Sequence, residues 1–138
     1  MSMGCPLLDQ LSFRSYNEGG THVVELDITD DIRGPTGAVH GGLIASLADR
    51  AGAYASVVAG GRSVVTSTVA LNYLAAATGG PLRAVADVLR TGRQQGTVEV
   101  RIYDAGREDR LVALALLTMS FVPGEIPRPG QVGSGEAG

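Results

Sequence analysis

The chain has 138 residues, of which 44% are hydrophobic, and a formal net charge of −3 at pH 7. This length fits a single domain with a substantial core, and the negative charge argues against a nucleic-acid partner, because nucleic-acid-binding proteins usually carry a basic patch. The one cysteine, Cys5, cannot form a disulfide within the chain and is typical of a cytoplasmic protein. No segment resembles a signal peptide, and the longest uncharged run, residues 63–82, contains a Gly-Gly-Pro turn, so no membrane partner is expected.

The first third of the chain predicts short elements. Residues 6–12 start at a proline and predict one or two helical turns. Residues 21–29 alternate, with Val24 and Leu26 on the apolar face, and predict a half-buried strand. Residues 30–39 carry charges and then Gly-Pro and a further glycine, which predicts a loop.

Residues 41–58 predict one long helix of about five turns. Its larger apolar residues recur at helical spacing and predict the buried stripe. They are Leu43, Leu47, Ala51, Tyr54 and Val58. The adjacent Gly60 and Gly61 are typical of a helix C-terminus.

Strands follow over residues 64–74, 83–91, 97–103 and 110–122. The first is uncharged and predicts a buried strand, and a hairpin connection joins the second to the third. The last is nearly all apolar, which predicts a central strand buried on both faces.

One apolar helix against one antiparallel sheet is the simplest architecture that buries both, so the predicted fold class is α+β. The helix is apolar over much of its circumference, which favours a sheet that wraps around it. We expect a single domain over residues 1–122 and a disordered Gly- and Pro-rich tail over residues 123–138.

The start of the predicted helix carries the strongest chemical signal. Gly41 and Gly42 let a substrate carbonyl approach backbone N–H groups that have no intrahelical partner and lie at the positive end of the helix dipole. Asp49 follows Gly42 by seven residues, so the two lie about 20° apart on the helix, on a face of small residues. That face also holds Ala45, Ala53 and Ser56. Asp49 is therefore a candidate general base or nucleophile beside a cleft; the alternatives are an acid in a solvated surface patch or an acid paired with Arg50.

Two histidines are the other candidates for acid–base or metal chemistry. His40 directly precedes the glycines, and its interpretations are a helix cap, which we favour, or a group that contacts substrate or transfers protons. His22 opens a strand and is interpreted as structural. Neither histidine has metal-ligand spacing with Cys5, so no metal is expected.

Polar side chains on the strand at 64–74 need partners. Alternation places Thr66, Thr68 and Asn72 on one face, where they either satisfy one another or line a cleft.

Arginines gather around the hairpin that joins the second and third of these strands. Arg90, Arg93 and Arg101 are candidates to bind phosphate groups, and the alternative, ordinary surface charge, is favoured by sequence alone.

The run Gly37-x-Val39-His40-Gly41-Gly42 with Asp49 nine residues after His40, together with residues 69–77 (Val-Ala-Leu-Asn-Tyr-Leu-Ala-Ala-Ala), resembles a known family. Over about residues 20–122 the sequence resembles the hotdog-fold acyl-CoA thioesterases. The resemblance is to the PaaI-like (phenylacetate-pathway) branch of the 4-hydroxybenzoyl-CoA thioesterase superfamily. The second run resembles the "INYLRPA" strand of that family.

This resemblance implies a long central helix wrapped by an antiparallel sheet, in homodimers that pair into homotetramers. It also implies hydrolysis of small or medium acyl-CoA thioesters, aromatic ones included, at sites in the dimer interface. No cofactor is implied, because coenzyme A is part of the substrate.

The resemblance also implies residue roles. The backbone N–H of Gly41 or Gly42 would polarise the thioester carbonyl, and the partner chain's Asp49 would attack it or activate water. His40 belongs to the same motif, and Thr66 aligns with a Ser or Thr that helps to position water.

The remaining implied residues contact substrate. Asn72 and Tyr73 belong to the strand motif, and Arg90, Gly92 and Arg93 fall where the family often contacts the nucleotide of coenzyme A.

The chain departs from the family pattern at two places. Gly34 stands where members commonly carry an Asn that helps to place the attacking water, and Arg33 is the neighbour that could partly replace it. Ala75-Ala76 replaces the family's Arg-Pro. A non-catalytic acyl-CoA binding or sensing protein is therefore the main alternative, and a dehydratase or hydratase with His40 as base is a further one.

Overall fold

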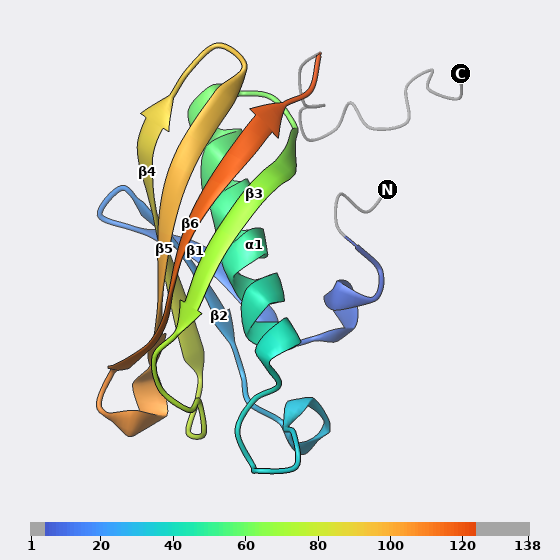
Figure 1. Ribbon diagram of the computed structural model, residues 1–138, viewed down its shortest axis with the longest axis vertical. Coiled ribbons are helices and arrows are strands. Elements are labelled where there is room, and N and C mark those ends of the chain that lie inside the picture. The colour runs from blue at the N-terminus through green and yellow to red at the C-terminus, as the bar shows by residue number, and fades with distance from the viewer. Residues whose placement is uncertain (1–4, 124–138) are drawn as a thin grey trace.

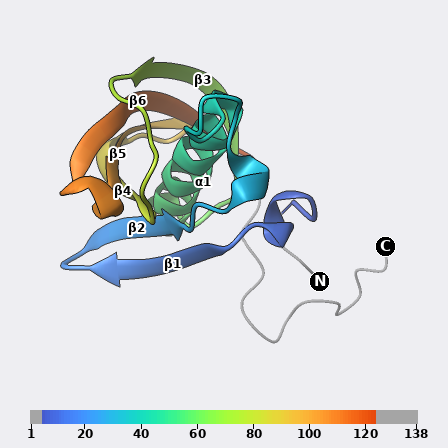
Figure 2. The same ribbon diagram turned by 90° about the horizontal axis from the view of Figure 1, so that it is seen from below.

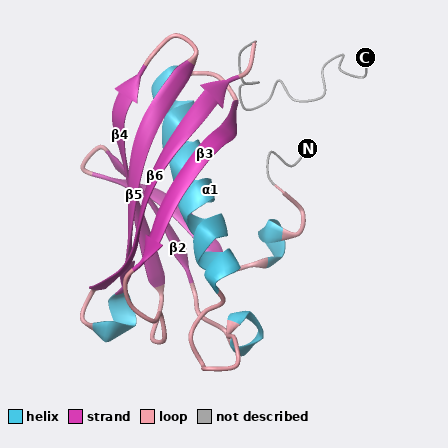
Figure 3. Ribbon diagram, in the orientation of Figure 1, coloured by secondary structure: helices cyan, strands magenta, loops and turns pink. Residues whose placement is uncertain are grey.

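The computed structural model describes residues 5–123 as one helix and a six-stranded antiparallel sheet with strand order β1-β2-β4-β5-β6-β3 (Figures 1 and 3). The elements in chain order are η1 (Leu8–Gln10), β1 (Phe13–Glu18), β2 (Thr21–Leu26), η2 (Asp30–Ile32), α1 (Gly41–Gly60), β3 (Val64–Tyr73), β4 (Leu82–Thr91), β5 (Gln95–Asp104), η3 (Ala105–Arg107) and β6 (Arg110–Phe121). Figure 2 shows the sheet curling around α1. The predicted α+β architecture is confirmed; the predicted disordered tail lies outside the described residues except for Pro123.

The helix boundaries follow from local sequence. His40 caps the N-terminus, because its Nδ1 accepts the Gly42 N–H at 3.1 Å. At the other end Gly61 adopts a left-handed conformation (φ 71°) and donates its N–H to the Val57 carbonyl at 2.8 Å. The predicted glycine stop is confirmed, and α1 runs two residues beyond the predicted end at 58. Within residues 5–123, no helix is long and apolar enough to cross a membrane.

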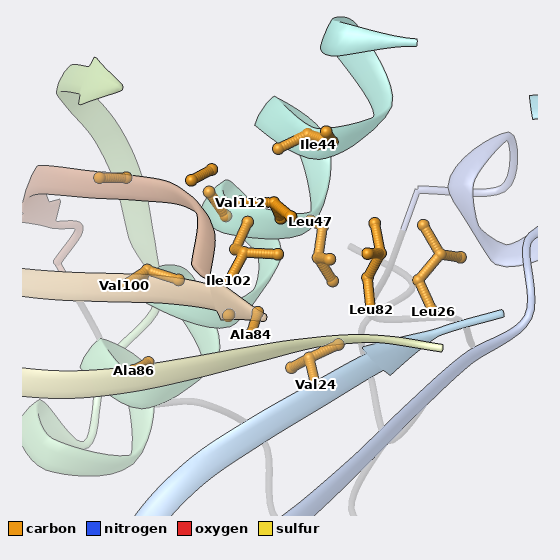
Figure 4. Close-up of a cluster of buried hydrophobic side chains, with 14 of the residues drawn as sticks. Val24, Leu26, Ile44, Leu47, Leu82, Ala84, Ala86, Val100, Ile102 and Val112 are labelled. Carbon is orange, nitrogen blue, oxygen red and sulfur yellow. The ribbon is translucent and has the colours of Figure 1, made fainter. Parts of the chain in front are cut away.

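The core lies between α1 and the concave face of the sheet (Figure 4). Alternate residues of β5 point into it, and three of them have fully buried apolar side chains. They are Val98, Val100 and Ile102. Each large side chain of this kind contributes roughly 1.5–3 kcal/mol when it is fully buried.

The predicted apolar stripe of α1 is only partly correct. Leu47 and Ala51 are fully buried, but Tyr54 and Val58 are 45% and 56% exposed. Apart from Ile44 and Leu47, the buried face of α1 is made of small residues, which are Ala48, Ala51, Gly52, Ala55 and Ser56. The sheet approaches α1 closely: a Cβ at Gly52 would lie 3.2 Å from side-chain atoms of both Met119 and Val98. Because the sheet packs closely against α1, small residues occupy most of the buried face, whereas the sequence pattern predicted a stripe of larger ones.

Strand β1 was not predicted. Its burial pattern shows one partly buried residue followed by exposed ones, so it lacks the apolar alternation that marks a half-buried strand. Antiparallel pairing of all six of its residues with β2 holds it instead. Side-chain contacts add to this pairing: Arg14 donates to Asp27 at 2.7 and 3.0 Å and to Glu25 at 2.9 Å. The Tyr16 hydroxyl donates to Glu25 at 2.6 Å, which raises the pKa of Tyr16 to about 12.

Two other strand predictions need correction. Strand β3 is present, but it is an edge strand that pairs only with β6, and residues 65–70 are exposed rather than buried. Strand β6 is central, as predicted, but only one of its faces is buried in a single chain. On its outer face Leu116 is 46% exposed.

Candidate active site

The helix N-terminus is held by the loop that precedes it. The Val39 N–H donates to Ala77 O at 2.9 Å, and the His40 N–H donates to Ile32 O at 3.0 Å. Because His40 Nδ1 already accepts the Gly42 N–H, that donor is occupied. The Gly41 N–H has no hydrogen-bond partner within the described chain. Of the two predicted carbonyl-polarising groups, Gly41 is therefore the one that is free for a substrate oxygen.

The capping bond also settles how His40 can act. A neutral imidazole whose Nδ1 accepts a hydrogen bond carries its proton on Nε2. The cap interpretation of His40 is thus confirmed, and while the cap is intact the exposed Nε2–H is a hydrogen-bond donor rather than a base.

A pocket of about 330 Å³ opens beside Gly41. The Tyr73 hydroxyl donates to Gly41 O at 2.7 Å and so joins the end of β3 to the start of α1. Most of the other lining residues are small and apolar; the full set is Ala38, Val39, Gly41, Ile44, Tyr73, Leu74, Ala75, Ala76 and Ala77. The Ala75-Ala76 pair that replaces the family's Arg-Pro therefore forms part of an apolar wall next to the free N–H.

Asp49 and Thr66 meet between α1 and β3. The Thr66 hydroxyl donates to Asp49 Oδ1 at 2.5 Å, and it also lies 3.5 Å from the sulfur of Met119. Asp49 Oδ2 has no partner among residues 5–123. The alternative pairing of Asp49 with Arg50 is wrong, because Arg50 pairs with Asp9 at 3.4 Å. Asp49 is a half-buried carboxylate with one oxygen fixed and the other available.

A β-bulge separates the three polar residues of β3. The register shifts between Thr66, which pairs with Met119, and Thr68, which pairs with Thr118. Because paired residues share a face and Met119 is fully buried, Thr66 faces α1, whereas Thr68 and Asn72 face outward. The prediction that all three share one face is wrong, and Asn72 does not line the pocket beside Gly41.

Gly41 and Asp49 lie far apart along α1. Eight residues of helix span about 12 Å, which exceeds the reach of an aspartate side chain. The free N–H and the free carboxylate oxygen of one chain therefore cannot contact the same carbonyl group.

The backbone and the surroundings at Gly34 leave room for a side chain. A Cβ at Gly34 would meet only Ala38 O, at 3.7 Å, and the residue does not have a positive φ. The neighbouring Arg33 is already engaged, since its Nη1 donates to Gly37 O at 2.7 Å and to Thr78 O at 3.1 Å. Arg33 therefore fastens the loop that carries Gly34.

The predicted arginine cluster is divided. Arg93 lines a pocket of about 450 Å³ with Arg62, whose guanidinium stacks over Phe121 at 4.8 Å and donates to Arg93 O. Arg62 was missed by sequence reasoning; its place just after the helix stop was the only signal. Arg101 is engaged with Glu99 at 2.9 Å.

The structure places the other predicted residues away from the pocket beside Gly41. The Gly92 N–H donates to Gln95 O at 2.8 Å and closes the β4–β5 hairpin, and Arg90 is exposed on β4. His22 is 8% exposed and its ring meets the Tyr54 ring edge-on at 5.1 Å. Over residues 5–123, no group of three or more His, Cys, Asp or Glu side chains could hold a metal ion.

Comparison with known proteins places these features in a family. Residues 36–110, more than half of the chain, match the Thioesterase superfamily. The structure is similar to the PaaI protein of the E. coli phenylacetic acid degradation operon (27% identity, TM-score 0.79, 88% of each chain covered). It is also similar to a conserved protein of Pseudomonas aeruginosa (28%, TM-score 0.78, 87% of this chain and 96% of that one). A mutant of the phenylacetic acid degradation protein PaaI of Thermus thermophilus is a third similar structure (26%, TM-score 0.73, 86% and 100%).

A comparison with curated protein sequences finds no match. The superfamily match and the PaaI structures together confirm the resemblance seen in the sequence. The chain belongs to the thioesterase superfamily and has the hotdog fold of its PaaI-like members.

Proposed function

We propose that the protein is an acyl-CoA thioesterase that hydrolyses small or medium acyl groups, aromatic ones included. The observation that carries this proposal is the Thr66–Asp49 hydrogen bond of 2.5 Å, which leaves Asp49 Oδ2 free to react. The free Gly41 N–H of a second copy of the chain supplies the second requirement, a donor for the oxyanion.

These groups suffice for thioester chemistry. Asp49 takes a proton from water, the water oxygen bonds to the carbonyl carbon, and the Gly41 N–H stabilises the resulting oxyanion. Collapse of this intermediate breaks the C–S bond and releases a thiolate, which needs no strong general acid because a thiol pKa is about 8.5. The alternative route, direct attack by Asp49 on the carbonyl carbon followed by hydrolysis of the anhydride, uses the same residues.

We propose that each site forms between two copies of the chain. The separation of about 12 Å between Gly41 and Asp49 along α1 supports this arrangement, since a second copy can bring the partner's Asp49 to Gly41. The exposed, uncharged edge of β3 offers ten residues for pairing with that copy. The exposed apolar side chains of Leu116 and Val65 favour further pairing of dimers into a homotetramer.

We place the phosphate-bearing end of coenzyme A at the pocket of Arg62 and Arg93. Guanidinium groups suit phosphate oxygens, and no acidic residue lines this pocket within the described chain. Arg90 lies on the β4 strand that leads into the same hairpin and adds positive charge nearby. The substrate is then bound by its carrier at one end and by the apolar pocket at the other.

Thiol release from a panel of acyl-CoA esters tests this proposal. The panel contains short, medium and long acyl groups together with phenylacetyl and hydroxybenzoyl. With the best substrate, Asp49→Asn should lower kcat by about a hundredfold or more, as expected for a lost general base. The matched control is Asp27→Asn, which removes the same charge at the exposed Arg14 pair and should leave kcat unchanged. Equal rates in wild type and Asp49→Asn would contradict the proposal.

Binding without hydrolysis is the second candidate, and the empty position at Gly34 is the observation that favours it. Calorimetric binding of acyl-CoA esters, together with the absence of thiol release across the whole panel, would establish this function in place of the first.

A further inference from the structure

Asp104, at the end of β5, is a buried carboxylate with no part in the chemistry above. Its side chain is 0% exposed, and it belongs to none of the ion pairs found among residues 5–123. Backbone N–H groups surround it instead. Those of Thr78 (2.9 Å) and Gly79 (3.0 Å) donate to Oδ2, and those of Gly80 (2.7 Å) and Gly106 (3.1 Å) donate to Oδ1.

These four donors replace the water that a carboxylate loses on burial. Burial alone would raise the pKa of Asp104, but the N–H groups outweigh it and hold the pKa below its ordinary value. The side chain is therefore charged at neutral pH and holds two turns together, residues 78–80 and residues 104–106.

Glycines make this contact possible. A Cβ at Gly79 would lie 2.8 Å from the carbonyl carbon of Gly106 and 3.0 Å from Asp104 Oδ1, and a Cβ at Gly106 would lie 2.4 Å from Gly80 O. No side chain fits at either position. The two turns pack backbone against backbone around the carboxylate, so the position of residues 78–80 depends on Asp104.

The 78–80 turn, which Asp104 holds, lies next to the loop before α1, and hydrogen bonds from that loop join it to residues 77 and 78. Thr78 O accepts from Arg33 Nη1 at 3.1 Å, and Ala77 O accepts from the Val39 N–H at 2.9 Å. Val39 lies two residues before Gly41. Residues 74–77 also line the pocket into which Gly41 opens.

We propose that Asp104 is a positioning residue, which fixes residues 74–80 and, through them, the Gly41 N–H and the wall of the adjacent pocket. This inference rests on the proposed function for its catalytic consequence, but its structural part stands independently. Asp104 never contacts substrate; it acts through the 78–80 turn and the loop of Arg33 and Val39.

Amide hydrogen exchange on the Asp104→Asn protein tests the structural part. The neutral amide places an NH₂ group against N–H donors, so peptides covering residues 33–42 and 74–81 should exchange about tenfold faster or more. Peptides from β1 and from the C-terminal half of α1 should exchange as in wild type. Unchanged exchange over residues 33–42 would overturn the proposal.

Steady-state kinetics tests the catalytic part, at a temperature well below the unfolding transition of each protein. Asp104→Asn should lower kcat/KM by about tenfold or more, whereas the matched control Asp27→Asn should not. A purely stabilising role predicts the wild-type kcat/KM for the folded variant, and that result would overturn the proposal. If the wild type hydrolyses no thioester, the proposed function fails, and hydrogen exchange still decides the role of Asp104.

Arg33→Gln covers the case in which Asp104→Asn does not fold. Arg33 is partly exposed and links the 78–80 turn to the loop through Thr78 O and Gly37 O. This variant should also speed exchange over residues 33–42 while leaving β1 unchanged. Wild-type exchange over residues 33–42 in Arg33→Gln would overturn the proposal as well.

Discussion

The two edges of the sheet, β1 and β3, are built in opposite ways. β1 has six residues, and Arg14 and Glu18 bring charge to its exposed side. β3 has ten residues and no charge at all, yet most of it is exposed. Charged side chains on an edge strand disfavour pairing with another chain, whereas a long uncharged edge strand favours it. This difference supports the proposal that a second copy pairs at β3 and completes the site there, whereas β1 closes the opposite side of the sheet.

The largest loss of pairing and activity is expected when a charge is placed on β3. Ala70→Lys on β3 should prevent pairing and lower kcat/KM by about a hundredfold or more, because Gly41 of one chain then lacks the partner's Asp49. Analytical ultracentrifugation and thiol release measure the two effects. The control is Ser15→Lys on β1, which should remain oligomeric and active. An active monomeric Ala70→Lys protein would contradict the assignment of β3.

A smaller effect is expected where β3 meets α1. Thr66→Val keeps the shape of the side chain but removes the hydroxyl that orients Asp49. A hydrogen bond to a charged group contributes roughly 1.5–3 kcal/mol, so kcat should fall by about tenfold or more with little change in KM. Thr68→Val, which alters the outward face beyond the bulge, is the matched control and should leave kcat unchanged. Equal losses in both variants would show that Thr66 has no special role.

The smallest effect is expected at the charged edge. Asp27→Asn should reduce the free energy of unfolding at pH 7 by no more than about 1 kcal/mol, because the pair with Arg14 is exposed. The hydrogen bond from Arg14 lowers the pKa of Asp27 in the folded state. The stabilisation is therefore present above the unfolded pKa of about 4 and is lost as the pH falls through the lower folded value. Denaturant unfolding from pH 7 to pH 2 should show the two proteins converging in acid; a difference that grows in acid would contradict this sign.

The features that sequence could predict were those with strong local signals. Helix α1, its cap at His40 and its stop at Gly61 follow from periodicity and glycine positions, and so do β4, β5 and β6. The resemblance in the His-Gly-Gly motif identified the superfamily. Asp49 and Thr66 were named from sequence, and the structure brings them together.

The features that sequence missed depend on distant partners. β1 is held by backbone pairing with β2 and lacks apolar alternation, so its own residues do not mark it as a strand. The bulge between Thr66 and Thr68 that reverses the faces of β3 has no sequence signal either. In the sequence Asp104 is indistinguishable from an ordinary turn residue. Three of its four donors lie in a turn about 25 residues earlier in the chain, so no local pattern reveals them. Exposure of β3 was misjudged because an uncharged strand can be buried by its own chain or by a second copy.

Mixing two inactive variants tests the central claim most directly. Gly41→Pro removes the free N–H; proline is favoured at the first helical position, and the extended ψ of 134° at His40 suits a residue before proline. Gly41→Pro and Asp49→Asn should each be nearly inactive alone. Refolded together in equal amounts, they should recover about a quarter of wild-type activity, because half of the dimers are hybrids with one intact site of two. No recovery in verified hybrid dimers would show that Gly41 and Asp49 do not act across two copies.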